Sequence, residues 1–398
     1  MDHEVAIVGG GVVGLSTAKH LAASTGLDVA LLEKEAQFAG HQSGRNSGVL
    51  HPGFNYEPGS RKARFATTGT ERMKQYCREH DIPLEEFGVL VTAQDGDERA
   101  RLEELRAQAE ENGVETSLLD NEELVEHEPH AAGQAALYAP GAASIDSVQY
   151  VHQLARDVQQ AGVDVYLGTR VEELVRTRTG YRLKTTAGAI DAAFVVNAAG
   201  LYADELAHQV GVGEQYQIVP FRGEYYEVVP DRRQLVNTMV YPTPDPELPF
   251  LGVHFTRRTD DKVIIGPNAV LAFGREAYRN TQVNLRELAE TLGYSGFWRM
   301  LASPKMVSVA AAELNKSYRP DRFVRAAQRL IPDLREDDVV KSFAGIRAQV
   351  VRTDGTLVKD PLFETESDAI HVLNAVSPGL TASLPFGEHL AEAVAERL

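Results

Sequence analysis

EVAIVGGGVVGLSTAKHLAAST, residues 4–25, is the stretch that decides the fold. A short apolar run leads into three glycines in the spacing G-x-G-x-x-G, and an Ala- and Leu-rich segment follows to about Ser24. This order predicts a strand, a tight turn and a helix. In such a unit Gly9 permits the turn, Gly11 lets the backbone approach a pyrophosphate, and Gly14 lets the helix pack closely on the strand. The helix N-terminus adds N–H donors and a positive dipole end, so the stretch predicts dinucleotide binding.

A second predicted strand, DVALLEKE, strengthens that interpretation because of where its acidic residue falls. Glu33 stands nineteen residues after Gly14. An acidic side chain at this distance accepts hydrogen bonds from the ribose of an adenosine. Glycine-rich turns are common by themselves, but a strand, glycines, a helix, a second strand and an acid in register together indicate an adenine dinucleotide site.

The segment after the second strand bears on whether the dinucleotide is NAD or FAD. Residues 36–60 intervene before the next predicted helix, 61–80, whereas a simple nicotinamide dehydrogenase usually continues quickly into that helix. This segment contains HQSGRNSGVLHPG, residues 41–53, which is rich in hydroxyl, amide and glycine positions. We interpret it as a source of donors to the flavin end of FAD, through Ser43, Arg45, Asn46, Ser47 and Gly48. The alternative is a polar surface loop that tolerates length.

Two later segments end in similar turns of small residues. AFVVNAAGLYADELAHQVG, residues 193–211, predicts a buried strand, a turn at 197–200 and a helix. Near the end of the chain, HVLNAVSPGLTASLPFGEHLAEAVAERL predicts a strand, a turn at 377–381 and a terminal helix. Amides of that last turn lie where a helix is expected to begin, so they are suited to bind an electron-rich carbonyl.

Composition limits the classes of protein that the chain can form. Its 398 residues, 43% hydrophobic and 24% charged, predict a globular protein of two or three structural units. The formal net charge of −17 argues against nucleic-acid binding and favours solubility or tolerance of high salt. Cys77 is the only cysteine, so neither an internal disulfide nor a thiolate metal site is possible, and we expect no metal.

Location and assembly are less constrained by the sequence. We expect neither an export signal nor a membrane-spanning helix, because no run of about 18 apolar residues occurs. A cytoplasmic protein is the resulting expectation, and peripheral contact with the inner face of the membrane stays open, for example through a patch around Phe297 and Trp298. The alternative for these two residues is the end of a core helix. The oligomeric state is not determined.

The motifs together resemble those of a known family. The glycine pattern with Glu33, the NAAG turn and the SPGLT turn resemble the D-amino-acid-oxidase-like FAD-dependent oxidoreductases, which include glycerol-3-phosphate, sarcosine and glycine oxidising enzymes. Over essentially the whole chain, a narrower similarity is to L-2-hydroxyglutarate dehydrogenases and oxidases. It is carried by HQSGRNSGVLHPGFNYEPGSRKAR, PFRGEYY, FLGVHFTRR and GPNAVLAFGREAY.

The resemblance implies a mixed fold, α/β (α+β overall). A doubly wound FAD-binding domain is expected from the discontinuous segments 1–85, 145–215 and 335–398. A largely antiparallel β-sheet substrate domain is expected from the inserted segments 86–144 and 216–334. It also implies noncovalent FAD held by these groups: Gly9, Gly11 and Gly14 at the pyrophosphate, Glu33 at the ribose, residues 43–48 at the centre, Val171 at the adenine, Gly200 at the ribityl chain, and Gly379, Leu380 and Thr381 at the flavin pyrimidine edge.

Oxidation of a 2-hydroxy acid requires a base and anchors for carboxylates. Histidine is the natural base near neutral pH, and His51 and His254 are the two candidates, with His41 less favoured. Guanidinium groups match carboxylates bidentately. The candidate substrate-binding residues are Arg257, Arg347, Arg222, Arg275 and Tyr241, with Tyr225 as a further hydroxyl donor. Asn268 and Ala269 belong to the similar segments but receive no role.

The expected partners are therefore a small dicarboxylate and an electron acceptor, either oxygen or a quinone. Another 2-hydroxy acid, glycerol 3-phosphate or an amino acid is the near alternative to L-2-hydroxyglutarate. Two alternatives come from other classes: an FAD-binding sensor or structural protein, and a nicotinamide dehydrogenase.

Overall fold

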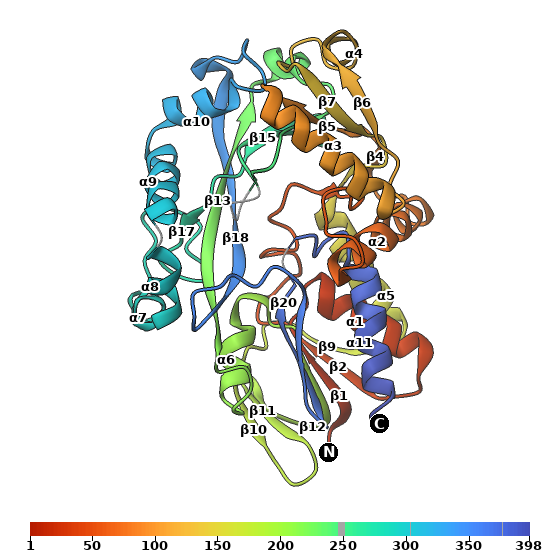
Figure 1. The fold of residues 1–398 in the computed structure, drawn as a ribbon. Coiled ribbons are helices and arrows are strands. Elements are labelled where there is room, and N and C mark those ends of the chain that lie inside the picture. Colours follow the sequence, from red (N-terminus) through yellow and green to blue (C-terminus); the bar gives the residue numbers. More distant parts are fainter. Residues whose placement is uncertain (246–250, 303, 376) are drawn as a thin grey trace.

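Two large β-sheets form the frame of the molecule, one in the lower and one in the upper half of Figure 1. The structure, a computed structural model, describes residues 1–245, 251–302, 304–375 and 377–398. Phe250, the first residue of the segment FLGVHFTRR, therefore lies outside the described residues. Within the described part of the chain, no helix is both long and apolar enough to cross a membrane.

The lower sheet has eight strands in the order β10-β11-β12-β1-β2-β9, with β20 beside β12 and β19 beside β20. Its central pairs, β12–β1, β1–β2, β2–β9 and β12–β20, are parallel, whereas β10–β11–β12 and β19–β20 are antiparallel. The strands are β1 (His3–Val8), β2 (Val29–Leu32), β9 (Asp164–Tyr166), β10 (Val171–Arg176), β11 (Tyr181–Thr185), β12 (Gly188–Asn197), β19 (Leu362–Thr365) and β20 (Ala369–Asn374).

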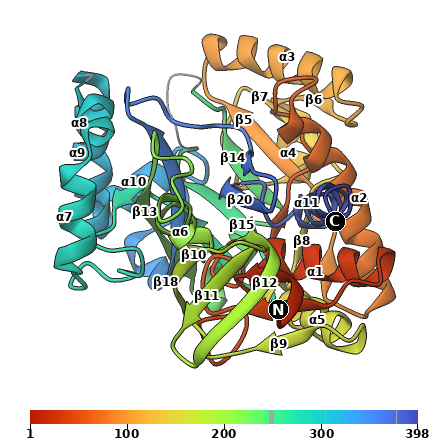
Figure 2. The same ribbon diagram turned by 90° about the horizontal axis from the view of Figure 1, so that it is seen from below.

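Helices pack on this sheet because its central strands are apolar on both faces. All four residues of β2 are buried, as are five of the six of β1. The helices are α1 (Val12–Ser24), α2 (Arg61–Glu79), α5 (Ser147–Gln160), α6 (Ala203–His208) and α11 (Ser383–Ala395). A Cβ at Gly387 would lie 2.2 Å from Ser16 Oγ, so α11 and α1 approach closely through this glycine. Figure 2 shows α1, α2, α5 and α11 grouped on one side of the molecule.

The upper sheet has nine strands in the order β17-β13-β16-β15-β14-β5-β7-β6, with β18 also beside β13. Every pair is antiparallel except β14–β5. The strands are β5 (Val89–Ala93), β6 (Ser117–Asp120), β7 (Ala135–Ala139), β13 (Tyr216–Val228), β14 (Met239–Pro242), β15 (His254–Arg257), β16 (Val263–Gly266), β17 (Val270–Leu271) and β18 (Val339–Arg352). A small sheet of β3 (Val49–Leu50), β8 (Ala143–Ile145) and β4 (Leu84–Glu85) completes the strands.

The remaining helices accompany the upper sheet. They are α3 (Gly96–Glu111), α4 (Asn121–His127), α7 (Leu285–Gly293), α8 (Ser295–Leu301), α9 (Pro304–Tyr318) and α10 (Pro320–Ala327), with short 3₁₀ turns at Gly200–Tyr202, Pro230–Leu235 and Glu336–Asp338. The resemblance implied a largely antiparallel sheet domain that includes 216–334, and the four helices α7–α10 lie within this segment. Figure 1 shows α7, α8 and α9 stacked along the outer edge, beside the long strands β13 and β18.

The predicted fold class is confirmed, since a largely parallel α/β unit carries a second, largely antiparallel sheet. The division into domains needs one change at its last boundary. β18 lies in the segment 335–398 that was assigned to the cofactor domain, yet it pairs with β13 from Tyr216↔Arg352 to Val228↔Val339. We therefore propose that the final cofactor-domain segment begins near residue 353.

Candidate active site

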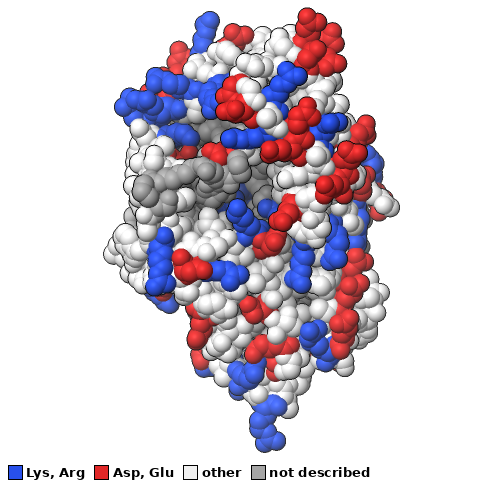
Figure 3. All heavy atoms as spheres, in the orientation of Figure 1, with Lys and Arg blue, Asp and Glu red and all other residues white. Residues whose placement is uncertain are grey.

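One large cavity, of about 930 Å³, lies between the two halves of the molecule. Its walls come from the β1–α1 turn, the loop after β2, the turns at 198–202 and 377–381, and strands β13, β14 and β18. Carboxyl ends of β1, β2 and β12 meet at this edge of the lower sheet, which is where open α/β sheets bind ligands. Figure 3 shows a hollow near the middle of the face, with basic side chains at its margin.

The glycine turn forms one wall of the cavity and has no space for side chains. Gly9 has φ +108°, and a Cβ there would lie 2.4 Å from the carbonyl oxygen of Ala198. A Cβ at Gly14 would lie 2.0 Å from the carbonyl oxygen of Gly9. The first turn of α1 therefore packs directly on the N-terminal strand, and the NAAG turn contacts it from the other side. This arrangement leaves the backbone of Gly11 on the cavity surface.

Glu33 is held in place at the end of β2 by backbone amides. Its Oε2 accepts a hydrogen bond from Gly10 N at 2.8 Å, and its Oε1 accepts one from Glu35 N at 2.9 Å. Each carboxylate oxygen has a second lone pair. Because Glu33 also lines the cavity, its carboxylate can accept further hydrogen bonds from the hydroxyls of a ribose.

The loop of residues 41–48 is shaped by its own side chains. Ser43 Oγ accepts a hydrogen bond from Val12 N at 3.0 Å and so caps α1. Asn46 donates to the carbonyls of Gln42 and Ser43 and accepts from Gly48 N. Ser43, Arg45, Asn46 and Ser47 line the cavity, whereas Gly48, with φ +77°, forms the turn behind them.

The other predicted cofactor residues also lie on the cavity. Val171, Gly200, Gly379, Leu380 and Thr381 all line it. Thr381 Oγ1 accepts a hydrogen bond from His51 N at 3.2 Å, which joins the 377–381 turn to the segment after β3. Helix α11 begins at Ser383, so the turn precedes the helix. Three segments far apart in sequence thus contribute to one site.

Two histidines and a tyrosine, His51, His254 and Tyr241, also line the cavity. The ring of Tyr241 lies 4.2 Å from the ring of His254 and 6.1 Å from that of His51, centroid to centroid. Burial lowers the pKa of His254 to about 4, although its hydrogen bond to Gly252 opposes the change. Burial and the charges of His254 and Lys62 lower the pKa of His51 to about 4. Both imidazoles are therefore neutral near pH 7, as a general base requires.

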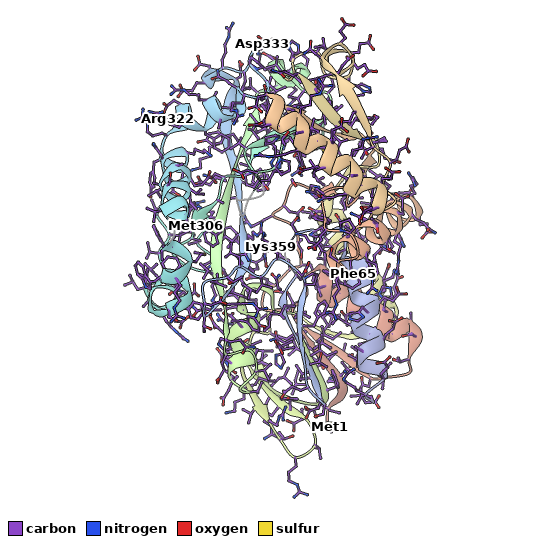
Figure 4. All side chains as sticks on the ribbon, viewed as in Figure 1. Met1, Phe65, Met306, Arg322, Asp333 and Lys359 are labelled. Carbon is purple, nitrogen blue, oxygen red and sulfur yellow. The ribbon has the colours of Figure 1, made fainter. Side chains whose placement is uncertain are left out.

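Lys62 and Arg347 form a cation pair at the same end of the cavity. Burial lowers the pKa of Arg347 to about 10. Burial and the charge of Arg347 lower the pKa of Lys62 to about 8, with Asp360 acting in the opposite direction and Lys359 in the same one. Figure 4 shows Lys359 near the centre of the molecule, between its two halves. The Lys62 ammonium lies 4.6 Å from the centre of the Tyr56 ring. Two desolvated cations that repel each other favour an anionic ligand.

Three of the arginines predicted for the substrate lie away from the cavity. Arg275 contacts Asp204 at 2.7 Å and Glu205 at 2.8 Å, and it is 4% exposed. Arg257 donates to the carbonyl of Val236 at 2.8 Å and pairs with Asp261.

Arg222 is buried on the opposite face of β13 from the cavity, because Phe221, Gly223 and Tyr225 take the face that lines it. It hydrogen-bonds the carbonyl of Ala277 at 3.3 Å. Strand alternation therefore decides which arginine of a strand faces the ligand.

His41 belongs to a polar cluster rather than to the histidine pair. Its Nε2 lies 2.8 Å from Glu35 Oε1, and its Nδ1 lies 2.7 Å from the Tyr278 hydroxyl. Lys34 stands between Glu35 and Glu276, with its ammonium 2.7 Å from Glu276 Oε1. The cluster joins the loop after β2 to the segment after β17.

Asn55, Tyr56 and Lys62 are among the cavity residues that received no role from the sequence. Ser60 caps α2 by accepting from Ala63 N at 3.1 Å, so Lys62 lies in the first helical turn. A cation at this position is unfavourable for the helix dipole. The unfavourable position of this cation in the sequence could therefore have indicated that Lys62 has a role other than stabilising the helix. Burial also raises the pKa of Tyr56 to about 12.

The cavity residues fit FAD. Glycines without space for a Cβ lie beside an amide-rich helix start, Glu33 offers carboxylate oxygens at the end of β2, and small-residue turns line the remaining walls. Cys77 does not line the cavity, and burial raises the pKa of its thiol to about 12, which suits a structural thiol.

The chain belongs to the family of FAD dependent oxidoreductases, the DAO family, whose pattern matches residues 4–393. The predictions of an oxidoreductase and of FAD are therefore confirmed. The chain is 40% identical, over 98% of both sequences, to L-2-hydroxyglutarate dehydrogenase of Indibacter alkaliphilus. It is 38% identical to mitochondrial L-2-hydroxyglutarate dehydrogenase of Nematostella vectensis, over 99% of this chain and 91% of that one.

A solved structure has the same fold. Dithionite-reduced L-alpha-glycerophosphate oxidase of Mycoplasma pneumoniae, with FAD bound, matches at a TM-score of 0.79. The match covers 99% of this chain and 94% of that one at 24% sequence identity.

Proposed function

We propose that this protein oxidises L-2-hydroxyglutarate to 2-oxoglutarate with noncovalently bound FAD. The observation that carries the proposal is one cavity that is lined by a cation pair and two neutral histidines as well as by the glycine turn and Glu33. The similarity to L-2-hydroxyglutarate dehydrogenases supports the same substrate.

Each group of residues has a task in this reaction. When bound, FAD accepts the hydride that leaves C2 of the substrate. Gly9, Gly11 and Gly14 would hold its pyrophosphate and Glu33 its adenosine ribose. One of the two histidines takes the hydroxyl proton, and the buried site excludes water from it. Lys62 and Arg347 hold the two carboxylates, so a dianion fits this end of the cavity better than a neutral or singly charged acid does.

Anaerobic mixing with candidate substrates tests the proposal. L-2-Hydroxyglutarate should bleach the flavin absorbance of the purified protein, and 2-oxoglutarate should appear in equal amount. Faster bleaching by another 2-hydroxy acid, by glycerol 3-phosphate or by an amino acid would identify that compound as the substrate in place of L-2-hydroxyglutarate. If no candidate reduces the flavin, the protein is a sensor or structural flavoprotein instead.

Substrate capture should weaken as the pH rises above about 8, because Lys62 then loses its charge. Its pKa is lowered, so the ammonium is intact below this pH and neutral above it. A profile of kcat/KM from pH 6 to 10 should show a fall with an apparent pKa near 8. Lys62→Met should lower kcat/KM by about 30-fold and remove this limb, and Lys62→Arg should move the limb to higher pH. A profile that stays level to pH 9.5 would exclude Lys62 from capture.

The electron acceptor is oxygen or a membrane quinone, and the surface of α7–α9 favours the quinone. Of the thirteen exposed large hydrophobic residues in the described part of the chain, seven lie within 283–318. Leu285 is 78% exposed and Trp298 55%. On α9, Val307, Leu314 and Tyr318 share one face by helical spacing, and the others are Val283 and Leu292.

The charge of this region differs from that of the whole chain. Residues 285–327 contain seven Lys or Arg and four Asp or Glu, whereas the chain carries −17. Uncharged side chains predominate along the left edge of Figure 3, where α8 and α9 lie, and Figure 4 shows Met306 and Arg322 on this edge. An apolar face with a local positive charge suits the surface of an anionic bilayer. We therefore propose that the protein, expected in the cytoplasm, makes peripheral contact with the inner face of the membrane through this surface.

Co-sedimentation with vesicles of anionic lipid tests this contact. The unaltered protein should pellet with the vesicles, and Leu285→Ser with Trp298→Ser should reduce the bound fraction by about tenfold, because each removes roughly 1 kcal/mol of apolar contact. Val148→Ser, at an exposed apolar residue on α5, is the matched control and should bind as before. If the unaltered protein stays in the supernatant at low salt, the membrane contact is wrong and oxygen becomes the acceptor to test.

A further inference from the structure

His254 has a hydrogen bond that fixes where its proton lies. Its Nδ1 is 2.8 Å from the carbonyl oxygen of Gly252. A carbonyl oxygen only accepts hydrogen bonds, so Nδ1 must be the donor and must carry the hydrogen. When the ring is neutral, Nε2 therefore has no hydrogen and presents a lone pair.

The position of the ring makes that lone pair relevant to the reaction. His254 is 7% exposed, lines the cavity at the start of β15, and packs against Tyr241. His51 differs in this respect. Within the described part of the chain, neither ring nitrogen of His51 has a hydrogen-bond partner, and only its backbone groups are bonded, to Thr381 and Thr70. The fold therefore fixes the tautomer of His254, whereas the tautomer of His51 can follow the ligand.

We propose that His254 is the base of the reaction, accepting the hydroxyl proton at Nε2, and that His51 binds the substrate beside it as a hydrogen-bond donor. This assignment rests on the proposed function. As the substrate O–H bond breaks, its proton passes to Nε2. The C–H bond of C2, the carbon that carries this hydroxyl, also breaks. Its electron pair leaves with the hydrogen as hydride, for which bound FAD would be the acceptor, and C2 becomes a carbonyl carbon. The alcohol is oxidised by two electrons, which bound FAD would accept, and the proton stays on the imidazole until product leaves.

The electrostatics of the cavity agree with this division. Burial lowers the proton affinity of both imidazoles. A dianionic substrate places negative charge beside both rings, and this charge raises their proton affinity again. His254 becomes a stronger base only when substrate is present. The hydrogen bond to Gly252 adds to this effect, because it strengthens when the ring is protonated.

Histidine NMR tests the tautomer without depending on activity. In the FAD-containing protein labelled with ¹⁵N-histidine, the resonances that His254→Gln removes should show Nδ1 protonated and Nε2 bare at pH 7. His130, which lies 3.0 Å from Asp333 and does not line the cavity, provides the control variant His130→Gln. That variant should leave the His254 resonances unchanged. An Nε2-protonated His254 would overturn the assignment.

Anaerobic single-turnover reduction tests the role. His254→Gln should slow flavin reduction by about 100-fold with the substrate Kd within roughly threefold, because glutamine retains a polar atom but takes no proton. His51→Gln should mainly raise the Kd, and His130→Gln should change neither. Flavin reduction in His254→Gln at the rate of the unaltered protein would overturn the assignment of His254 as the base and leave the proposed function intact. If L-2-hydroxyglutarate does not reduce the unaltered protein, the proposed function itself fails, which is a separate result.

Discussion

Gly9→Ala will leave the protein unable to retain FAD. Gly9 has φ +108°, which side chains of L-residues disfavour, and a Cβ would lie 2.4 Å from the carbonyl oxygen of Ala198. Strain and overlap of this kind together cost on the order of 4 kcal/mol. Relief requires separation of the β1–α1 turn from the NAAG turn, and that movement opens the cradle for the pyrophosphate. We expect FAD affinity to fall roughly 1,000-fold.

The ratio of flavin to protein absorbance after gel filtration measures this effect, and far-UV circular dichroism checks the fold. Gly26→Ala is the matched control in the same α1–β2 unit, because a Cβ there meets nothing within 4 Å. It should retain FAD as before. Full FAD content in Gly9→Ala would contradict the pairing of these two turns at the cofactor site.

The cofactor half was predictable because its signals are local. Gly9, Gly11, Gly14 and Glu33 lie within one strand–turn–helix–strand unit, and such spacing is readable along the chain. The structure places these residues together, although their contacts with FAD stay predictions. The 377–381 turn was recognisable through its Pro and Gly, but only the fold shows that Thr381 bonds the backbone of His51.

The substrate-binding residues were less predictable, because which of them face the cavity depends on the register of the strands that carry them. PFRGEYY contains an arginine between residues that line the cavity, and a shift of one residue would have turned Arg222 inward. The local sequence does not reveal which residues of the strand face the cavity. Arg275 was obscured for another reason, since its partners Asp204 and Glu205 lie about 70 residues earlier on α6.

The surface of α7–α9 was also hard to predict from the sequence. These helices carry apolar residues on outward faces, so their apolar pattern does not distinguish the inner from the outer side. The sequence left open whether Phe297 and Trp298 mark a surface patch or the end of a core helix, and the answer differs between the two residues. Phe297 is buried and Trp298 is exposed on the same helix, α8.

Arg347→Met will lower kcat/KM for L-2-hydroxyglutarate by about 1,000-fold, which corresponds to about 4 kcal/mol. Arg347 lies on β18 where the strand lines the cavity, and burial lowers its pKa to about 10 without neutralising it at pH 7. In the proposed function, a substrate carboxylate beside this guanidinium would form a desolvated ion pair with two parallel hydrogen bonds. Truncation leaves the carboxylate buried without its partner, which costs more than the loss of an exposed ion pair.

Steady-state kinetics with two substrates separate this effect from a general loss of activity. Arg347→Lys, which keeps the charge but loses the fork, should recover part of the loss. Arg352→Met, at an exposed arginine on the same strand, is the matched control and should change kcat/KM by less than about threefold. A monocarboxylate such as 2-hydroxybutyrate should lose less on Arg347→Met if Arg347 holds the distal carboxylate, and as much if it holds the carboxylate beside C2. An unchanged KM and kcat for L-2-hydroxyglutarate would mean that the substrate lies elsewhere in the cavity.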